Sequence, residues 1–261
     1  MLIKVCAVQS RLGDRLSTEE RLFIFKQRPD FVCLPEYCLI GPEAVDFIRP
    51  ALDVKENLAL LKDLSGSLNT CLIGGSVVEA DNDLFYNSSY VFDRGDIIGR
   101  YRKLNPVSGE IAKGILPGDR IFVKEIDDIK IGILICADAL NPVLFGLLGE
   151  YGVDIIFIPT TSPYRPGESR VEKHKRDNDI YLSGAQEAGA FIVKCCGAGQ
   201  LFGKPLQGRS LIAAPWGIVQ RVDISSEMDP CILTGVFDIT ELREFRDKKK
   251  HSTIDITDSN L

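Results

Sequence analysis

The chain has 261 residues, of which 45% are hydrophobic and 26% charged, and its 31 basic and 37 acidic side chains give a formal net charge of -6. This balance is typical of a globular protein with one large core and excludes a disordered, collagen-like or coiled-coil chain, so we expect a single domain over residues 1–261. The acidic charge gives no reason to expect binding to nucleic acid or to a membrane.

Short, continuously apolar runs alternate with amphipathic stretches, a pattern typical of buried strands covered by helices. In chain order, the predicted strands are Ile3–Val8, Phe31–Leu34, Thr70–Val78, Ser88–Phe92, Ile97–Tyr101, Lys130–Ile135, Ile155–Pro159, Ala190–Cys195, Ser210–Ala213 and Leu233–Asp238. The predicted helices are Thr18–Lys26, Lys55–Leu68, Val143–Tyr151, Glu172–Ala188 and Glu241–Asp247. So many strands favour two sheets packed face to face with helices outside. The sequence Asp93-Arg94-Gly95-Asp96 predicts a hairpin, and therefore a mixed sheet.

The start of the sequence, MLIKVCAVQS, lacks the apolar stretch and cleavage site of a secretory signal. No apolar run approaches the roughly 18 residues that a membrane span needs. Cys6, Cys33, Cys71 and Cys136 lie in apolar segments, as is typical of buried thiols in a reducing compartment. We therefore expect a cytoplasmic protein.

A candidate nucleophile lies near the end of the segment KIGILICAD, where an apolar strand reaches Cys136 and a helix is predicted to begin near Asn141. A thiol at the carboxyl end of a strand, facing the N-terminus of the next helix, is in a positive potential that lowers its pKa. This favours Cys136 as a nucleophile. The alternative is a buried core cysteine, which is the commoner case for a cysteine taken alone.

Two further candidates follow predicted strands. Glu36, in FVCLPEY, is positioned as a general base, with a solvated loop glutamate as the alternative. Lys103, in RYRKLNP, is positioned to stabilise a developing oxyanion, with a surface charge as the alternative. Because open α/β sheets assemble their sites at the carboxyl ends of strands, these two residues and Cys136 are expected at one edge.

Five motifs follow one another along the chain: LPE, YRKLNP with SGE ending seven residues beyond the lysine, LPGD, KIGILICAD and LQGRSLIAAPWG. In this order and spacing they resemble the nitrilase or carbon-nitrogen hydrolase superfamily, from IKVCAVQ to FDITELREFR. The resemblance implies an α/β fold, a four-layer α-β-β-α sandwich with mixed sheets, paired through its outer helices into a homodimer. It also implies a Glu-Lys-Cys triad, which falls on Glu36, Lys103 and Cys136.

The resemblance gives each residue a role in hydrolysing a small amide or nitrile. Glu36 takes the thiol proton, and Cys136 attacks the carbonyl or nitrile carbon. Lys103 and the backbone N–H of Ala137 stabilise the resulting negative charge, and Glu110 positions substrate and water. Water then hydrolyses the thioester acyl-enzyme, and the reaction needs no metal and no organic cofactor.

The flanks of these motifs leave alternatives open. Asp138 favours an amidase, but Ala137 replaces the aromatic residue common in the family, and Leu140 replaces the arginine of the omega-amidase branch. A nitrilase or an N-carbamoyl-amide hydrolase is the alternative within the enzyme class, and a catalytically inactive dimeric scaffold is the alternative outside it. Arg165, in the loop PYRPGESR, is a candidate for substrate selectivity or simply an exposed charge.

Other kinds of site are less consistent with the sequence. The two histidines, His174 and His251, lie in the charged segments KHKRD and KKKHS, which disfavours a Cys-His hydrolase or a histidine metal site. The segment GAGQLFG has its third glycine one residue late for a dinucleotide-binding loop, so it predicts a turn.

Overall fold

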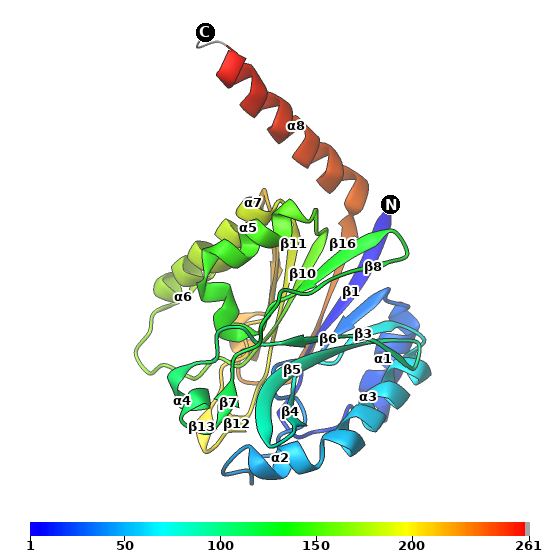
Figure 1. Cartoon of the computed structure of the whole chain (residues 1–261), viewed down its shortest axis with the longest axis vertical. Helices are drawn as coiled ribbons and strands as arrows, with labels where there is room; N and C mark the ends of the chain where they lie inside the picture. Colours follow the sequence, from blue (N-terminus) through cyan, green and yellow to red (C-terminus); the bar gives the residue numbers. More distant parts are fainter. Residues whose placement is uncertain (259–261) are drawn as a thin grey trace.

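The computed structural model describes residues 1–258, with side chains described through Lys249. Residues 259–261 of the expected domain and the side chain of His251 lie outside this description. The chain forms two β-sheets packed face to face between two layers of helices (Figure 1). The predicted four-layer α-β-β-α sandwich is therefore confirmed.

The first sheet contains the N-terminal strand and is mixed. Its strands, in spatial order, are β16 (Cys231–Asp238), β1 (Leu2–Gln9), β2 (Phe31–Cys33), β3 (Cys71–Ile73), β5 (Leu84–Asp93) and β4 (Val77–Asp81), with β6 (Asp96–Arg102) and β7 (Ile115–Leu116) paired to β5. β1, β2 and β3 are parallel, whereas β16 and β5 run antiparallel to them. The predicted hairpin joins β5 to β6, and its two turn residues, Arg94 and Gly95, both have positive φ.

The second sheet is also mixed. In spatial order it contains β15 (Gly217–Arg221), β14 (Leu211–Ala214), β11 (Phe191–Cys196), β10 (Ile155–Thr160), β9 (Ile129–Ile133) and β8 (Val123–Ile126). β9, β10 and β11 are parallel, and β8 and β14 are antiparallel to their neighbours. The segment predicted as a turn forms a separate hairpin of β12 (Gln200–Leu201) and β13 (Lys204–Pro205).

Helices cover the outer face of each sheet (Figure 1). The first sheet is covered by α1 (Thr18–Gln27) and α3 (Val54–Leu68), and the second by α5 (Pro142–Glu150), α6 (Arg170–Asp177) and α7 (Ser183–Ala188). Two short helices, α2 (Ile48–Leu52) and α4 (Ser108–Ile111), lie in connections, and α8 (Ile239–Asp258) projects away from the sandwich. Within residues 1–258, no helix has the length and apolar character needed to cross a membrane.

Side chains alternate between the two faces of each sheet, and both faces are covered. In β1, Val5 and Ala7 point into the core between the sheets, whereas Cys6 and Val8 pack beneath α1 and α3. Successive side chains of a strand face opposite sides, so a strand between two covered faces must be apolar at every position. This is the origin of the continuous apolar runs in the sequence.

Two predicted elements are interrupted. The expected strand Thr70–Val78 is divided into β3 and β4, because Gly75 lies between them with a φ of +60° and approaches Pro35 so closely that a Cβ would lie 2.0 Å from its carbonyl oxygen. The expected helix Glu172–Ala188 contains a π-helical turn, Asn178–Leu182, between α6 and α7. The strands β8 and β15 were not predicted, since these edge segments carry exposed polar residues rather than a continuous apolar run.

A buried ion pair attaches the base of α8 to the second sheet. Asp154, only 1% exposed at its side chain, accepts hydrogen bonds from Arg243 Nη2 at 2.8 Å and from Arg246. Burial alone would raise the pKa of Asp154, but the hydrogen bonds from Arg243, Lys130 N and Arg246 outweigh burial and lower it. The ionised carboxylate therefore stabilises the folded chain.

We predict that Asp154→Asn destabilises the protein by about 3 kcal/mol near neutral pH, because it leaves two arginines without their buried partner. The folded-state pKa of Asp154 lies below its unfolded value, so this contribution is full above the unfolded pKa of about 3.9 and is lost as the pH falls through the folded value. Urea unfolding between pH 7 and 3 checks this. The control is Asp63→Asn on the exposed face of α3; equal effects of both substitutions at pH 7 would contradict the prediction.

Candidate active site

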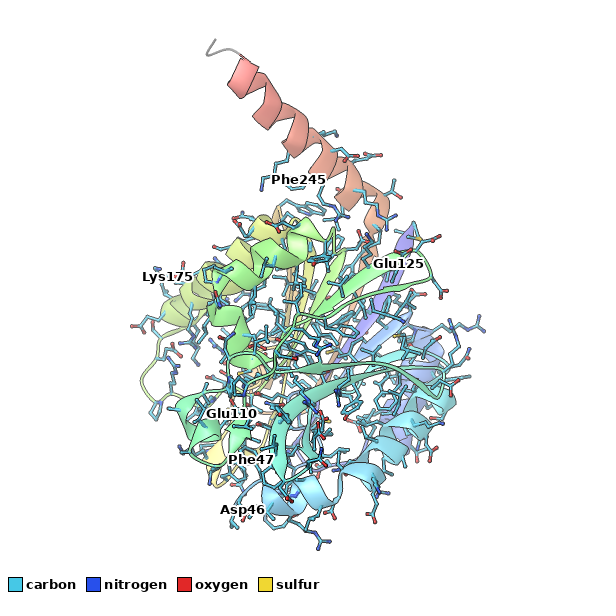
Figure 2. The ribbon with its side chains drawn as sticks, viewed as in Figure 1. Asp46, Phe47, Glu110, Glu125, Lys175 and Phe245 are labelled. Atoms are coloured by element: carbon cyan, nitrogen blue, oxygen red, sulfur yellow. The ribbon has the colours of Figure 1, made fainter. Side chains whose placement is uncertain are left out.

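The predicted site residues meet where several strands end. Glu36 follows β2, Lys103 follows β6, and Cys136 follows β9. All three, together with Glu110 and Thr161, line one cavity of about 600 Å³. This cavity is at the end of the sandwich away from α8, as the positions of Glu110 and Phe245 in Figure 2 show. Glu36 and Lys103 are in direct contact, and Glu36 and Cys136 each contact Thr161.

Glu36 is the most connected of the three side chains and is 1% exposed. Its Oε1 accepts hydrogen bonds from Lys103 Nζ at 2.8 Å and from Asn87 Nδ2 at 2.9 Å. Its Oε2 accepts hydrogen bonds from the backbone N–H of Thr161, at 2.9 Å, and from the Thr161 hydroxyl. The carboxylate is therefore fixed in orientation by donors from both sheets, and the alternative of a solvated loop glutamate does not hold.

Lys103 lies between two carboxylates. Its Nζ donates to Glu36 Oε1 and to Glu110 Oε2, the latter at 2.7 Å, and its side chain is 1% exposed. Burial would lower the pKa of Lys103, but the negative charges of Glu36 and Glu110 outweigh burial and raise it. Lys103 therefore remains an ammonium group and is not a surface charge.

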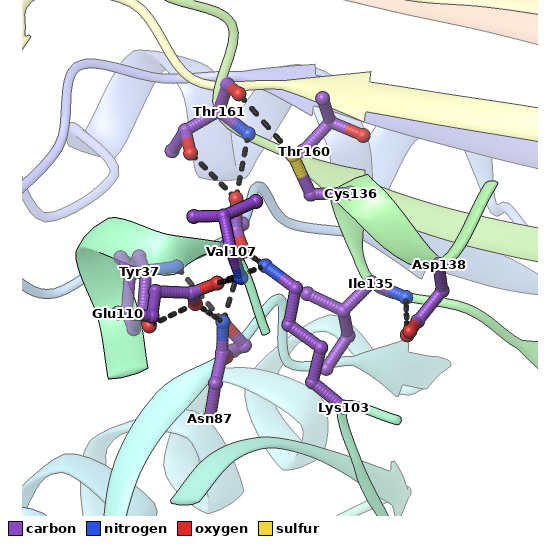
Figure 3. A network of polar contacts seen from close by, with 12 residues as sticks. Tyr37, Asn87, Lys103, Val107, Glu110, Ile135, Cys136, Asp138, Thr160 and Thr161 are labelled. Carbon is purple, nitrogen blue, oxygen red and sulfur yellow. Dashed lines mark hydrogen bonds and ion pairs between the residues drawn. The ribbon is translucent and has the colours of Figure 1, made fainter. Parts of the chain in front are cut away.

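Glu110 is held on the short helix α4 by four donors. Its Oε1 accepts from the Tyr37 hydroxyl at 2.6 Å and from Asn87 Nδ2 at 2.8 Å, and its Oε2 accepts from Lys103 and from Val107 N (Figure 3). Burial would raise the pKa of Glu110, but the charge and hydrogen bonds of Lys103, with those from Tyr37 and Val107, lower it. Glu110 is therefore an ionised partner of Lys103.

Three residues of this network were not predicted from the sequence. Tyr37 and Asn87 contact Glu110, Asn87 also contacts Glu36, and Thr161 contacts both Glu36 and Cys136. Tyr37 and Thr161 do carry a signal, because each stands beside the end of a predicted strand. Asn87 carries little signal, since it lies within β5 and its role depends on the pairing of that strand.

Cys136 lies in a strained turn. Its φ is +47°, a left-handed value that side chains other than glycine rarely adopt, and it opens a 3-10 turn, Cys136–Leu140, before α5. Its Sγ donates to Thr161 O at 3.4 Å (Figure 3). The side chain is half-buried, so the thiol is open to the cavity, and the alternative of a fully buried core cysteine does not hold.

The expected lowering of the thiol pKa is wrong. Burial first, and then the negative charge of Glu36, raise the pKa of Cys136 above its ordinary value, and the charge of Lys103 only partly offsets them. Lys103 is itself paired with two carboxylates, and the helix α5 begins beyond the 3-10 turn. Cys136 is therefore a neutral thiol that needs a base to become a nucleophile.

Asp138 connects the Cys136 turn to the loop that carries Lys103. It is fully buried, and it accepts hydrogen bonds from Ile135 N at 2.9 Å, from Tyr101 OH at 2.7 Å and from Asn105 N at 2.7 Å. Asp138 therefore accepts hydrogen bonds from a residue before and a residue after Lys103 in the chain, and from the residue that precedes Cys136. Its position indicates that Asp138 fixes the thiol relative to the lysine.

The structure places the remaining predicted residues at the cavity in different ways. Ala137 is buried directly after Cys136, so its backbone N–H lies beside the thiol. Arg165 is exposed and lines the cavity from the loop between β10 and α6. His174 lies on α6 and does not line the cavity.

The sequence model of the carbon-nitrogen hydrolase family matches residues 8–247. The chain belongs to this family. Among its relatives are an omega-amidase, NIT2-B of Xenopus laevis, 25% identical over 83% of this chain and 79% of that protein, and a nitrilase of Pyrococcus abyssi, 28% identical over 85% and 81%. The probable hydrolase YhcX of Bacillus subtilis is 28% identical over 69% of this chain, which spans only 39% of that protein's length.

Solved structures show the same fold. A carbon-nitrogen hydrolase from Helicobacter pylori G27 has a TM-score of 0.81 at 20% identity and covers 95% of this chain and 93% of its own. A mutant amidase from Nesterenkonia sp. AN1, with the acetamide moiety of fluoroacetamide added covalently to its active-site cysteine, has a TM-score of 0.74 at 14% identity, with 96% of each chain covered. The resemblance read from the sequence motifs is therefore confirmed for family and fold.

We predict that replacing the carboxylate of Glu36 lowers the pKa of Cys136, because the negative charge that opposes thiolate formation is removed. In Glu36→Gln, alkylation of Cys136 by iodoacetamide should rise at a lower pH than in the unaltered protein. Peptide mass spectrometry measures this at each pH, with the half-buried Cys231 as an internal reference. The matched control is Glu168→Gln on a neighbouring loop, and an unchanged or upward-shifted profile in Glu36→Gln would contradict the prediction.

Proposed function

We propose that the protein is a small-molecule amidase that uses Glu36, Lys103 and Cys136 through a thioester acyl-enzyme. The observation that carries this is the position of Glu36, whose carboxylate contacts Lys103 on one oxygen and Thr161 on the other, while the Cys136 thiol contacts the same Thr161. A base, a cation and a neutral thiol thus share one cavity. Family membership and the amidases among the relatives support this assignment.

In the proposed reaction, each step has a proton acceptor and a charge partner. Glu36 takes the thiol proton as Cys136 Sγ bonds to the amide carbon, and Lys103 with the N–H of Ala137 stabilises the charge on the amide oxygen. Glu36 returns the proton to the nitrogen, the C–N bond breaks, and ammonia leaves. Glu36 then takes a proton from water, which attacks the thioester and releases the acid while the thiol regains its proton.

Glu110 serves this cycle by holding Lys103 and Asn87 in place. It bonds both side chains, and each of them also bonds Glu36. Lys103 therefore remains oriented even when Glu36 becomes protonated in the intermediate. Glu110 is also placed to orient substrate and water, because it lines the same cavity.

A nitrilase or an N-carbamoyl-amide hydrolase is the alternative, since the same three groups serve attack on a nitrile or a carbamoyl carbon, and a nitrilase is among the relatives. Purified protein is assayed with parallel amide, nitrile and carbamoyl compounds. We expect ammonia release from amides and an acyl adduct on Cys136 after acid quenching, seen by mass spectrometry.

Cys136→Ala should lower amide turnover by about a thousandfold or more, because the nucleophile is lost. Cys231→Ala, at a second half-buried cysteine on β16, is the matched control and should keep its activity. Turnover that survives Cys136→Ala would refute the proposed nucleophile. A protein without turnover or adduct on any of the three compound classes would instead fit the inactive scaffold.

We also propose that the protein acts as a cytoplasmic homodimer paired through its outer helices. Val143 on α5 is 63% exposed, Val171 on α6 is 76% exposed, and Tyr151 after α5 is 58% exposed, so this layer offers apolar side chains that a second copy would cover. Sedimentation of the purified protein should give the mass of a dimer. Val171→Glu should shift it toward a monomer if α6 is in the interface, and a monomer for the unaltered protein at micromolar concentration would rule the proposal out.

A further inference from the structure

The active-site cavity carries a surplus of positive charge, although the whole chain has a formal net charge of -6. Four cations line the cavity, Lys103, Lys113, Arg165 and Lys204, against two carboxylates, Glu36 and Glu110. Lys103 is buried and bonds both carboxylates, so the inner part holds one positive charge against two negative ones, and the surplus of positive charge comes from the other three cations. The other three cations are exposed residues and therefore mark the solvent side of the cavity.

Arg165 and Lys204 lie next to a short backbone pairing between the loop after β10 and the strand β13. An antiparallel bridge joins Pro163 to Leu206. In the next pair, the backbone N–H of Tyr164 donates a hydrogen bond to Pro205 O at 2.9 Å. Arg165 and Lys204 are the next residues beyond this hydrogen-bonded pair, and both line the cavity. Like charges on neighbouring segments repel each other, so this arrangement fits an anion bound between the two side chains.

These cations are not neutralised by acidic side chains of the described chain. Through Lys249, no ion pair involves Lys113, Arg165 or Lys204. Glu168, the acidic residue nearest in sequence to Arg165, is paired with Arg176. The surplus charge is therefore available to a ligand.

An aromatic wall leads from the reacting end of the cavity to one of these cations. Tyr37, whose hydroxyl bonds Glu110, stacks on Phe47 with ring centroids 5.0 Å apart. Phe47 contacts the edge of Phe202 at 4.9 Å, and Lys113 Nζ lies 4.8 Å from the centre of the Phe202 ring. Phe202 also lies in the turn of the β12–β13 hairpin, two residues before Lys204, so a substrate that extends along this wall meets apolar surface first and positive charge at its far end.

We propose that the substrate is an amide whose acyl chain is apolar in its middle and ends in an anionic oxygen group, a carboxylate or a phosphate, bound by Arg165 and Lys204. The fork of the Arg165 guanidinium suits the paired oxygens of either group, and Lys204 adds a point charge. The positive cavity on an acidic protein also attracts such a substrate from solution. This inference rests on the proposed amidase function and specifies its substrate class.

The test compares amides of one acyl chain that end in a carboxylate, a phosphonate, a methyl ester or an ammonium group. The two anionic amides should have the highest kcat/KM. The ratio of their two kcat/KM values distinguishes a carboxylate site from a phosphate site. Added salt should raise the KM of both. Arg165→Gln and Lys204→Gln should each raise KM for the anionic amides about tenfold, with kcat little changed, and alter the methyl ester less than about twofold. In Arg165→Glu, the kcat/KM for the ammonium amide should increase.

Lys55→Gln, at an exposed lysine of α3 away from the cavity, is the matched control and should behave like the unaltered protein. Thermal unfolding of each variant verifies that it is folded. A wild-type preference for the methyl ester, or equal losses on charged and neutral amides in the variants, would overturn the inference.

Calorimetry with Cys136→Ala separates this inference from the proposed function. Tighter binding of the anionic amides, lost on adding Arg165→Gln, supports the anion site even if no turnover is found, in which case the amidase proposal alone fails. Turnover of neutral amides without any anion preference in binding or kinetics refutes the anion site alone.

Discussion

Lys103 is a buried ammonium group between two carboxylates, and the site depends on this arrangement. An isolated buried ammonium would lose its proton or destabilise the fold, because removing a charge from water costs several kcal/mol. Glu36 and Glu110 supply the compensating charge, at 2.8 and 2.7 Å. Each carboxylate in turn needs further donors, which come from Asn87, Tyr37 and Thr161. The network therefore holds as a unit, and both sheets contribute to it.

The same network decides the state of the thiol. With the charge of Lys103 shared between two carboxylates, little of it remains to stabilise a thiolate, and burial with the charge of Glu36 raises the pKa of Cys136. In the proposed reaction, a neutral thiol that shares a cavity with an oriented carboxylate favours transfer of the thiol proton during attack over a thiolate formed beforehand. Such a thiol is also less open to oxidation than an exposed thiolate.

The inner and outer ends of the cavity differ in burial and in charge. The inner end is buried, holds one cation between two carboxylates and is fixed by short hydrogen bonds, as the proposed reaction requires for the positioning of its reacting atoms. The outer end is built from loops and the β12–β13 hairpin, with exposed cations. Loops vary more than the strands that they connect, and binding specificity often lies on them. This division explains why motifs reveal the reaction class more readily than the substrate.

The apolar runs and strand-end motifs of the sequence by themselves determined the layered fold, the family, and the meeting of Glu36, Lys103 and Cys136. They suffice because a strand covered on both faces must be apolar throughout, and because parallel strands end at one edge. The tertiary structure alone decided the raised pKa of Cys136, the roles of Tyr37, Asn87 and Thr161, and the division of the strand at Gly75. Each of these depends on distances between segments far apart in the chain, and burial and charge act through such distances rather than through spacing in the sequence.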